Sequence, residues 1–245
     1  MIKFFRKIRQ NLLMENKTGK YFKYAIGEII LVVVGILIAL SINNWNSKHQ
    51  LKQQEQLVLK ELNNEFKSNK ILLDTAVFYH QRNFNSAQWI HNKLPIILKT
   101  IDIDSLSYHL FYMGWTFTYD PYTGVTNNVL NNASLELISD DELRQLLVSW
   151  NDILTDYQEE EIRAFNNYQN HLKPFEKKHF HFSFNYLDWL KNPKVDLNIL
   201  ETLEFDNYVE DRYNDCNEIL NNVSDELTHV YSSISRIIEL TELEY

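Results

Sequence analysis

The longest apolar run of the chain lies near its amino terminus. From Ala25 to Ile42 the sequence reads AIGEIILVVVGILIALSI, with an unbroken apolar core over Ile29–Leu40. Extended to Trp45, the run approaches the ~20 residues that an α-helix needs to cross about 30 Å of hydrocarbon. The pattern predicts a transmembrane helix over residues 24–45.

Two other structures fit the same run. A buried helix of a soluble protein could be this apolar, although the charged flank would then be a coincidence. Residues 39–41 read Ala-Leu-Ser, a crude cleavage site for a signal peptide. The apolar region of a signal peptide usually spans about 7–15 residues, and the charged region ahead of this run is unusually long. These lengths favour an uncleaved anchor.

The charge step across the run predicts its orientation. Residues 1–23 contain seven Lys or Arg and one Glu, a net charge of +6, whereas few basic residues closely follow the run. Positive charge marks the cytoplasmic side of a membrane helix. We therefore expect a single-pass protein of the inner (cell) membrane with a cytoplasmic amino terminus and a periplasmic carboxy-terminal domain.

Three residues inside the span are unusual for their position. Glu28 lies near the cytoplasmic end, where its side chain can reach the interface near Lys20 and Lys23; a functional role is the alternative interpretation. Gly35 and Ala39 form a small-xxx-small pair, which would allow a second span to approach closely and form a homo-oligomer.

The first fourteen residues, MIKFFRKIRQNLLM, have the pattern of an amphipathic helix. Apolar side chains cluster on one face of the helical projection, and basic ones point away from it. This pattern is typical of a helix lying on anionic lipid headgroups, and a disordered basic tail is the alternative. The residues expected at the membrane interface are Phe4, Phe5, Lys7, Ile8 and Trp45.

Beyond residue 46 the apolar positions recur at three- and four-residue steps, which predicts three long helices. The first covers residues 46–93, which lack Pro and Gly, ends at Pro95 and could continue the transmembrane helix. The second begins at a capping box, Ser139–Glu142, and ends at Pro174. The third runs from about Asp206 to Leu240. The apolar stripe of the first contains Leu51, Val58, Leu62, Phe66, Leu73, Ala76, Phe84 and Ala87. The apolar stripe of the third contains Leu220, Val223, Leu227, Val230, Ile234 and Ile238.

Shorter helices are expected over Asp104–Met113 and Tyr122–Ala133, with residues 178–205 irregular or partly helical. The predicted fold is therefore all-α, with a transmembrane helix followed by an extracytoplasmic antiparallel bundle containing three long helices. We expect a basic amphipathic tail over 1–23, the span over 24–45 and one helical domain over 46–245.

Composition narrows the class of function. The chain carries a net charge of −9, so the part beyond residue 23 carries −15, which does not suit a nucleic-acid binder. Cys216 is the only cysteine, so neither an intrachain disulfide nor a cysteine-based zinc site is possible. The sequence contains no Walker A, GxGxxG, GxSxG or HExxH motif.

Several histidines are candidates for metal chemistry. Two ExxH pairs, Glu176–His179 and Glu226–His229, match half of a di-iron pattern, but His229 turns away from the apolar stripe and the first pair follows a proline. His179 and His181 would share a face of an extended segment, although their aromatic neighbours favour packing. We therefore predict no metal and no cofactor.

One pair of ionisable residues falls on apolar faces. His80 lies on the apolar face of the first long helix and Glu161 on that of the second. A buried His–Glu pair would be a candidate for perturbed pKa values. Two partly exposed residues at the rim of the bundle are the more ordinary interpretation.

Two segments carry a resemblance to a known family. The run GEIILVVVGILIALSINNWN (Gly27–Asn46), preceded by FFRKIRQNLL (Phe4–Leu13), resembles the amino-terminal segment of an uncharacterised family of single-pass membrane proteins in Gram-negative bacteria. VLNNASLELISDDELRQLL (Val129–Leu147) is similar to the family's second recurring stretch, with Asn-Ala-Ser at 132–134 where the family usually has Ser-Ser-Gly. The resemblance implies a domain of unknown function in the inner membrane, and it supplies neither an activity nor site residues.

The sequence therefore favours a non-enzymatic protein that binds the lipid bilayer and, through a helical interaction or scaffolding domain, a protein partner, a ligand or a second copy of itself. Two alternatives remain: a metal-dependent enzyme built on the bundle, and a small-molecule sensor subunit of a membrane complex.

Overall fold

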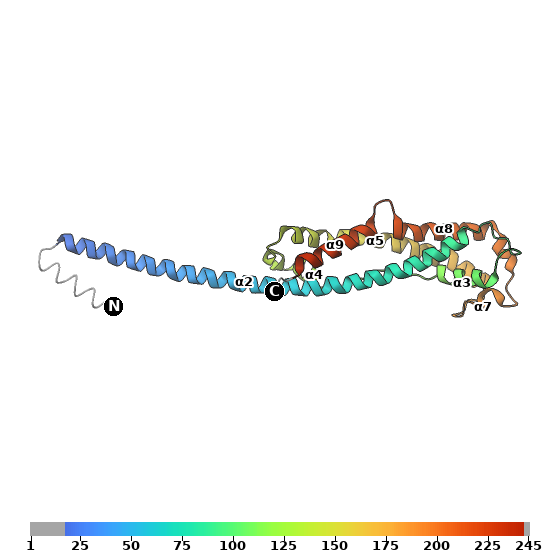
Figure 1. Cartoon of the computed structure of the whole chain (residues 1–245), viewed down its shortest axis with the longest axis horizontal. Helices are drawn as coiled ribbons and strands as arrows, with labels where there is room; N and C mark the ends of the chain where they lie inside the picture. The colour runs from blue at the N-terminus through green and yellow to red at the C-terminus, as the bar shows by residue number, and fades with distance from the viewer. Residues whose placement is uncertain (1–17, 243–245) are drawn as a thin grey trace. The chain divides into compact units, whose positions relative to one another are not determined.

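The structure of the protein is a computed structural model that describes residues 18–242, and the regular elements in this range are all helical. The tail residues expected at the membrane interface, Phe4, Phe5, Lys7 and Ile8, lie outside the described residues. The chain divides into two units, residues 1–55 and 56–245. One helix, α2 (Thr18–His91), supplies residues to both units (Figure 1).

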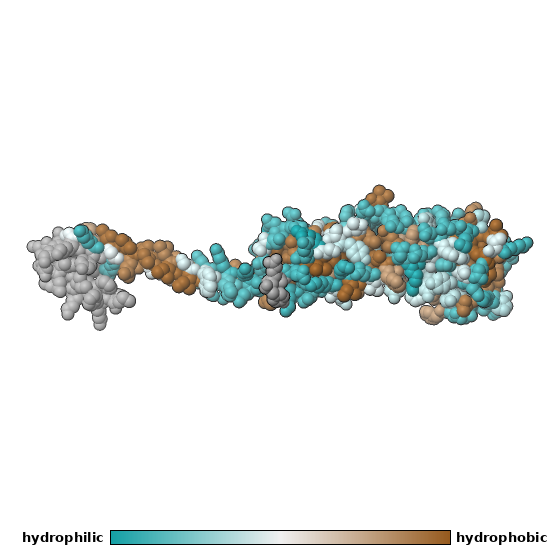
Figure 2. Space-filling view, viewed as in Figure 1, coloured by the Kyte–Doolittle hydropathy of each residue, from teal (hydrophilic) through white to brown (hydrophobic). Residues whose placement is uncertain are grey.

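The first unit contains the apolar run. Of the helices in the described part, α2 is the one long and apolar enough to cross a membrane; its most apolar window has a mean hydropathy of 2.8, with no part of it buried. Figure 2 shows this segment as a continuous apolar stretch of the helix. Gly35, Ala39 and Trp45 are all exposed. The core helix of a soluble protein would instead be largely covered.

The second unit has its first core between α2 and three other helices. α5 (Asp141–Asn167) packs against both α8 (Leu203–Asn221) and α9 (Glu226–Thr241). Their apolar stripes meet around Trp150, whose ring lies edge-on to that of Phe66 with centroids 5.1 Å apart. The expected stripe of α2 is buried from Leu62 to Ala87, with Phe84 only half-buried.

A second core, rich in aromatic rings, lies where α2 ends. It is formed by the last turns of α2, by α3 (Ile103–Met113), by α6 (Lys173–His179), by the short α7 (Asp188–Lys191) and by the first half of α8. Its largest buried side chains are Phe111, Tyr168, Phe175, Phe180, Trp189 and Phe205.

The expectation that Pro174 ends the second long helix is wrong. α5 continues through a π-helical turn, η2 (Tyr168–Leu172), into α6, where Pro174 occupies the first turn. The N–H of Lys173 donates to the carbonyl of Tyr168, five residues back, and this wider spacing lets a residue that lacks an N–H follow without breaking the helix. The cap at the start of α5 is Asp140, whose carboxylate accepts from the N–H of Leu143, rather than Ser139.

The expected third helix is two helices. α8 ends at Asn221, α9 begins at Glu226, and Asp225 between them has a φ of 52° in the left-handed region. Asn222, Ser224 and Asp225 favour turns because their side chains compete for backbone hydrogen bonds. Val223, placed on the apolar stripe by its spacing, is therefore fully exposed.

The shorter elements follow the expectation only in part. α3 begins one residue earlier than expected, whereas the helix expected over 122–133 is reduced to α4 (Gly124–Asn131), followed by a 3₁₀ turn, η1 (Ala133–Leu137). A second 3₁₀ turn, η3 (Leu197–Glu201), precedes α8. Residues 115–123, between α3 and α4, have no regular structure, and their backbone groups need partners from elsewhere.

Candidate functional site

A stripe of buried polar side chains on α2 supplies these partners. Asn69, His80 and Asn83 continue the three- and four-residue steps of the apolar stripe, and all three are buried. Each lies against the connection between α3 and α4 or against a residue that binds it. Burying a polar group is costly unless it is hydrogen-bonded. These residues stabilise the fold only because the connection, or Glu161 in the case of His80, forms hydrogen bonds with them.

Two side chains of α2, Glu65 and Asn69, bind the start of α4 and the segment before it. Glu65 accepts hydrogen bonds from the N–H of Val125 (2.6 Å) and from both the N–H and the hydroxyl of Thr126 (2.9 and 2.6 Å). A carboxylate at this position satisfies free N–H groups and complements the positive end of the helix dipole. The side chain of Asn69 forms two hydrogen bonds with the backbone of Tyr122, at 2.7 and 2.8 Å.

His80 and Glu161 form a buried pair, so the interpretation that placed them at an exposed rim is wrong. Nε2 of His80 lies 2.7 Å from Oε1 of Glu161, and both side chains are almost fully buried. The second oxygen of Glu161 accepts from the N–H of Tyr119 at 2.8 Å. Burial, followed by the nearby charge of Glu161, raises the pKa of the Tyr119 and Tyr157 hydroxyls. One oxygen of Glu161 thus holds the connection at Tyr119, and the other holds His80 of α2.

Arg212 of α8 fixes the other end of the connection. Its guanidinium is buried and donates from Nε to the carbonyl of Met113 and from Nη2 to that of Trp115, both at 2.8 Å. The side-chain amide of Asn83 donates to the same Trp115 carbonyl. Sequence reasoning missed Arg212, Asn83, Asn69 and Glu65. Their signal was the appearance of polar residues at core-facing positions of helices.

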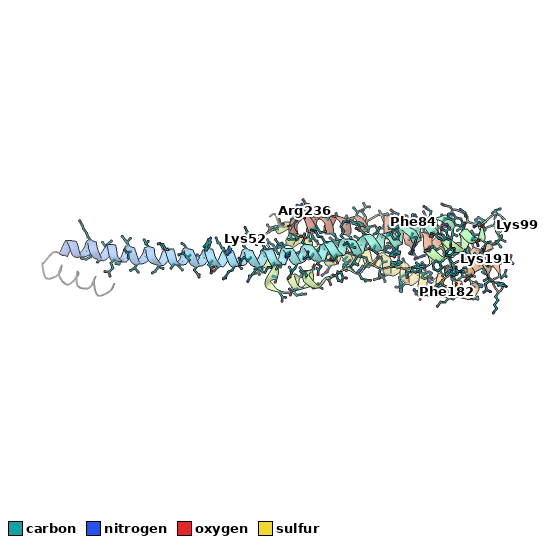
Figure 3. The ribbon with its side chains drawn as sticks, turned by 60° about the horizontal axis from the view of Figure 1, so that its bottom comes forward. Lys52, Phe84, Lys99, Phe182, Lys191 and Arg236 are labelled. Atoms are coloured by element: carbon teal, nitrogen blue, oxygen red, sulfur yellow. The ribbon has the colours of Figure 1, made fainter. Side chains whose placement is uncertain are left out.

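The segment held in this way forms one wall of a cleft in the second core. The cleft has a volume of about 390 Å³ and lies between the end of α3, the π-helical turn with α6, and the segment before α7. Phe182, labelled in Figure 3, is one of the side chains at its wall. The lining residues are Phe111, Gly114, Trp115, Thr116, Tyr168, Gln169, Lys173, Lys177, Phe182, Ser183, Phe184 and Trp189.

Gly114 is required by a close approach at this wall. A Cβ atom at this position would lie 2.9 Å from the hydroxyl oxygen of Tyr168, which is closer than real Cβ contacts. The φ of Gly114 is −80°, so its backbone conformation does not itself require glycine. The missing side chain lets the Tyr168 hydroxyl pass the Gly114 backbone.

Behind Tyr168 lies a buried carboxyl group. Glu176 is fully buried, and one of its oxygens accepts from the Tyr168 hydroxyl at 3.0 Å. Its other oxygen, Oε1, has no hydrogen-bond partner among the residues that the structure describes. Burial raises the pKa of Glu176 to about 8, against the lowering effects of the Tyr168 hydrogen bond and of the positive charges of Arg212 and Lys173. Glu176 therefore retains its proton well above the pH at which an ordinary carboxyl group loses it.

The other histidines considered for metal binding, and the cysteine, occupy separate environments. The ring of His179 packs on that of Phe175, with centroids 4.8 Å apart, while His181 and His229 are exposed. Cys216 is buried, which raises the pKa of its thiol. Within residues 18–242, no three His, Cys, Asp or Glu side chains are grouped in a way that could hold a metal ion.

The model of one protein family matches the chain over residues 28–151, and this family is described as a family of unknown function (DUF6090). The match includes the exposed apolar segment of α2, the polar stripe, α3, the connection and the start of α5. Neither a curated protein nor a solved structure matches the chain.

Proposed function

The chain belongs to this family of unknown function, and we propose that it is a membrane-anchored binding protein. The apolar segment of α2 would hold it in the cell membrane as a single span, and the second unit would bind a ligand or partner outside the cytoplasm. The protein would act by recognition and not by catalysis.

The observation that supports this proposal is that α2 contains two segments with different properties. The same helix has an exposed apolar segment at 25–42 and, farther along, the buried polar stripe that fixes one wall of the cleft. An exposed apolar surface of this extent is stable in lipid and costly in water. The cleft wall is made of rings, hydroxyl groups and two ammonium groups, which are the chemical groups of a ligand-recognition site.

The orientation follows from charge. Seven basic residues precede the span, and we infer that they remain in the cytoplasm. On this proposal the basic amino-terminal tail contacts anionic headgroups through Lys7 and its neighbours. The pair of Gly35 and Ala39, exposed on α2, is where a second copy would make contact within the membrane.

Labelling of single introduced cysteines tests the anchor and its orientation. Asn11→Cys and Ser47→Cys would be placed separately in the full chain and exposed to a membrane-impermeant maleimide in intact spheroplasts. We expect Ser47→Cys to react and Asn11→Cys to react only after permeabilisation. The unsubstituted chain is the matched control, because its buried Cys216 should react only after unfolding.

Two outcomes would contradict the proposal. The reverse labelling pattern would overturn the orientation. A soluble mature chain that begins near Ile42 would show that the run is a cleaved signal peptide and that no anchor remains.

A further inference from the structure

We propose that the cleft beside Trp115 and Tyr168 binds a small organic anion with a planar apolar body, an aromatic carboxylate. This inference rests on the proposed binding function and names the class of ligand for it. Four features of the cleft support it: its size and rings, its charge, the fixed position of its walls and the exposure of its rim.

The size and the rings suit a planar apolar body. A volume of about 390 Å³ lies at the small end of ligand pockets and accommodates a molecule of one or two rings. Phe111, Phe182 and Trp189 form a continuous aromatic wall, with ring centroids 5.6 Å apart for Phe111–Trp189 and 5.1 Å apart for Phe182–Trp189. Aromatic rings favour other rings in offset or edge-on contact, beyond the gain from buried area alone.

The charge of the cleft selects an anion. Lys173 and Lys177 are four residues apart on α6, so their side chains lie on the same face, and none of the described residues lining the cleft is acidic. This positive site is set in a chain whose net charge is −9. A local positive charge in an acidic domain attracts anions to this cleft.

Three rings of the cleft already have a cationic side chain over them. Nζ of Lys177 lies 5.5 Å from the ring centroid of Phe182, and Nζ of Lys173 lies 5.9 Å from that of Tyr168. The guanidinium of Arg82 lies 5.5 Å from the ring centroid of Trp115. A cationic ligand would therefore be repelled where an aromatic cage would normally attract it.

The walls are set before any ligand arrives. The carbonyl of Trp115 accepts from both Arg212 and Asn83, and the Tyr168 hydroxyl donates to Glu176. Tyr168 also begins a π-helical turn, a distortion that often occurs at functional sites. A preformed site avoids the entropic cost of ordering its side chains when it binds.

The rim of the cleft leaves apolar surface in water. The ring of Phe184 is 95% exposed and that of Phe182 is 44% exposed. A flat ligand seated against these rings would cover their exposed surface and remove it from water.

Calorimetric titration of the full chain in phosphatidylcholine nanodiscs tests the inference, with empty nanodiscs as the blank. The probes are 2-naphthoate, its neutral analogue 2-naphthylmethanol, and acetate, which has the charge without the ring. We expect 2-naphthoate to bind at least 10-fold more tightly than 2-naphthylmethanol, and acetate to bind more weakly than either.

Variants separate the charge from the rings. The double substitution Lys173→Gln/Lys177→Gln should weaken the binding of 2-naphthoate at least 10-fold and leave that of 2-naphthylmethanol unchanged. Lys178→Gln, which follows Lys177 in sequence but is not part of the lining, should change neither. Lys177→Glu should in addition make the cation 2-naphthylmethylamine bind more tightly. A thermal melt of each variant, monitored by circular dichroism, shows that the fold is retained.

Equal affinity for the anion and the neutral probe, equal losses in Lys178→Gln, or no binding of 2-naphthoate at millimolar concentration would each overturn the inference. The titration does not depend on which side of a cell membrane the cleft faces. A failure here would therefore leave the anchor and its orientation intact, and a failure of the cysteine labelling would leave the chemistry of the cleft intact.

Discussion

Glu161 in the first core and Glu176 in the second are both buried carboxyl groups, but they are satisfied to different degrees. Glu161 uses both oxygens, one toward His80 and one toward the N–H of Tyr119. Glu176 uses one, toward the Tyr168 hydroxyl, and its Oε1 has no partner in the described structure. Because the penalty for burying a polar atom is offset only when it is bonded, the two groups should affect stability in different ways.

The two carboxyl groups differ because their surroundings differ. Both oxygens of Glu161 have partners, and one of these partners is a backbone N–H of the connection, so this carboxylate supports the backbone there. Glu176 lies behind a cleft wall, and burial raises its pKa to about 8, so the stability of the second core depends on pH. Three substitutions test this contrast, from the largest expected effect to the smallest.

Glu161→Ala should be the most damaging change. It leaves His80 and the N–H of Tyr119 buried without their partner, and it opens a cavity in the first core. Removing one member of a buried pair costs about 3–5 kcal/mol of unfolding free energy. Denaturant unfolding of the full chain in detergent measures the loss. Glu159→Ala, an exposed neighbour on α5, should change the stability by less than about 0.5 kcal/mol. Similar losses for the two variants would refute the structural role of Glu161.

Glu176 should make stability fall as pH rises. Its pKa is about 8 in the folded chain against an ordinary value of 4.5, so between these values the folded state retains a proton that the unfolded state has lost. The contribution is fully present below about pH 4.5 and is lost as pH rises through about 8, with an upper limit of about 5 kcal/mol.

Thermal melts across this pH range show whether the dependence belongs to Glu176. Glu176→Gln, which cannot ionise, should remove most of the decline in melting temperature between pH 5 and pH 8. Glu136→Gln changes an exposed carboxyl on η1 and should retain the decline. An unchanged slope in Glu176→Gln would mean that this carboxyl is not the titrating group.

Gly114→Ala should have a smaller effect, of about 1–3 kcal/mol. The added methyl group would crowd the Tyr168 hydroxyl, whose hydrogen bond to Glu176 limits its movement. Gly124→Ala is the matched control, because a Cβ there meets its nearest atom at 3.9 Å and lies in the first turn of α4. Alanine suits a helix better than glycine, so the control should be neutral or slightly stabilising. Equal urea midpoints for the two variants would contradict the close approach at Gly114.

Sequence patterning predicted the helices but not all of their ends. The apolar steps from Leu62 to Ala87 predicted the buried stripe of α2 because one helix face meets one core. The end expected at Pro174 was wrong because a π-helical turn absorbed the missing N–H, and the continuous stripe expected through Val223 was wrong because turn-forming residues interrupt the helix there. Such breaks depend on local backbone hydrogen bonding, which the spacing of apolar residues does not show.

The site was less predictable than the fold. The spacing placed His80 and Glu161 on helix faces that could meet, and the structure brings them together. The role of Arg212 could not be predicted from the sequence. Its partners are the carbonyl groups of Met113 and Trp115, which lie 99 and 97 residues away in sequence. The cleft is formed by three segments that meet only through such long-range contacts, so the periodicity of one helix cannot predict it.

We infer that side chains of α2, α5 and α8 hold the connection between α3 and α4, an arrangement that sets the cleft wall. Amide hydrogen exchange of the full chain tests it most directly at Tyr119 and Tyr122, which lie in a segment without regular structure and donate to Glu161 and Asn69. We predict that these two amides exchange as slowly as core amides of α5, and that Glu161→Ala accelerates Tyr119 more than Tyr122. Exchange of both amides at the rate of an exposed loop in the unsubstituted chain would contradict the claim.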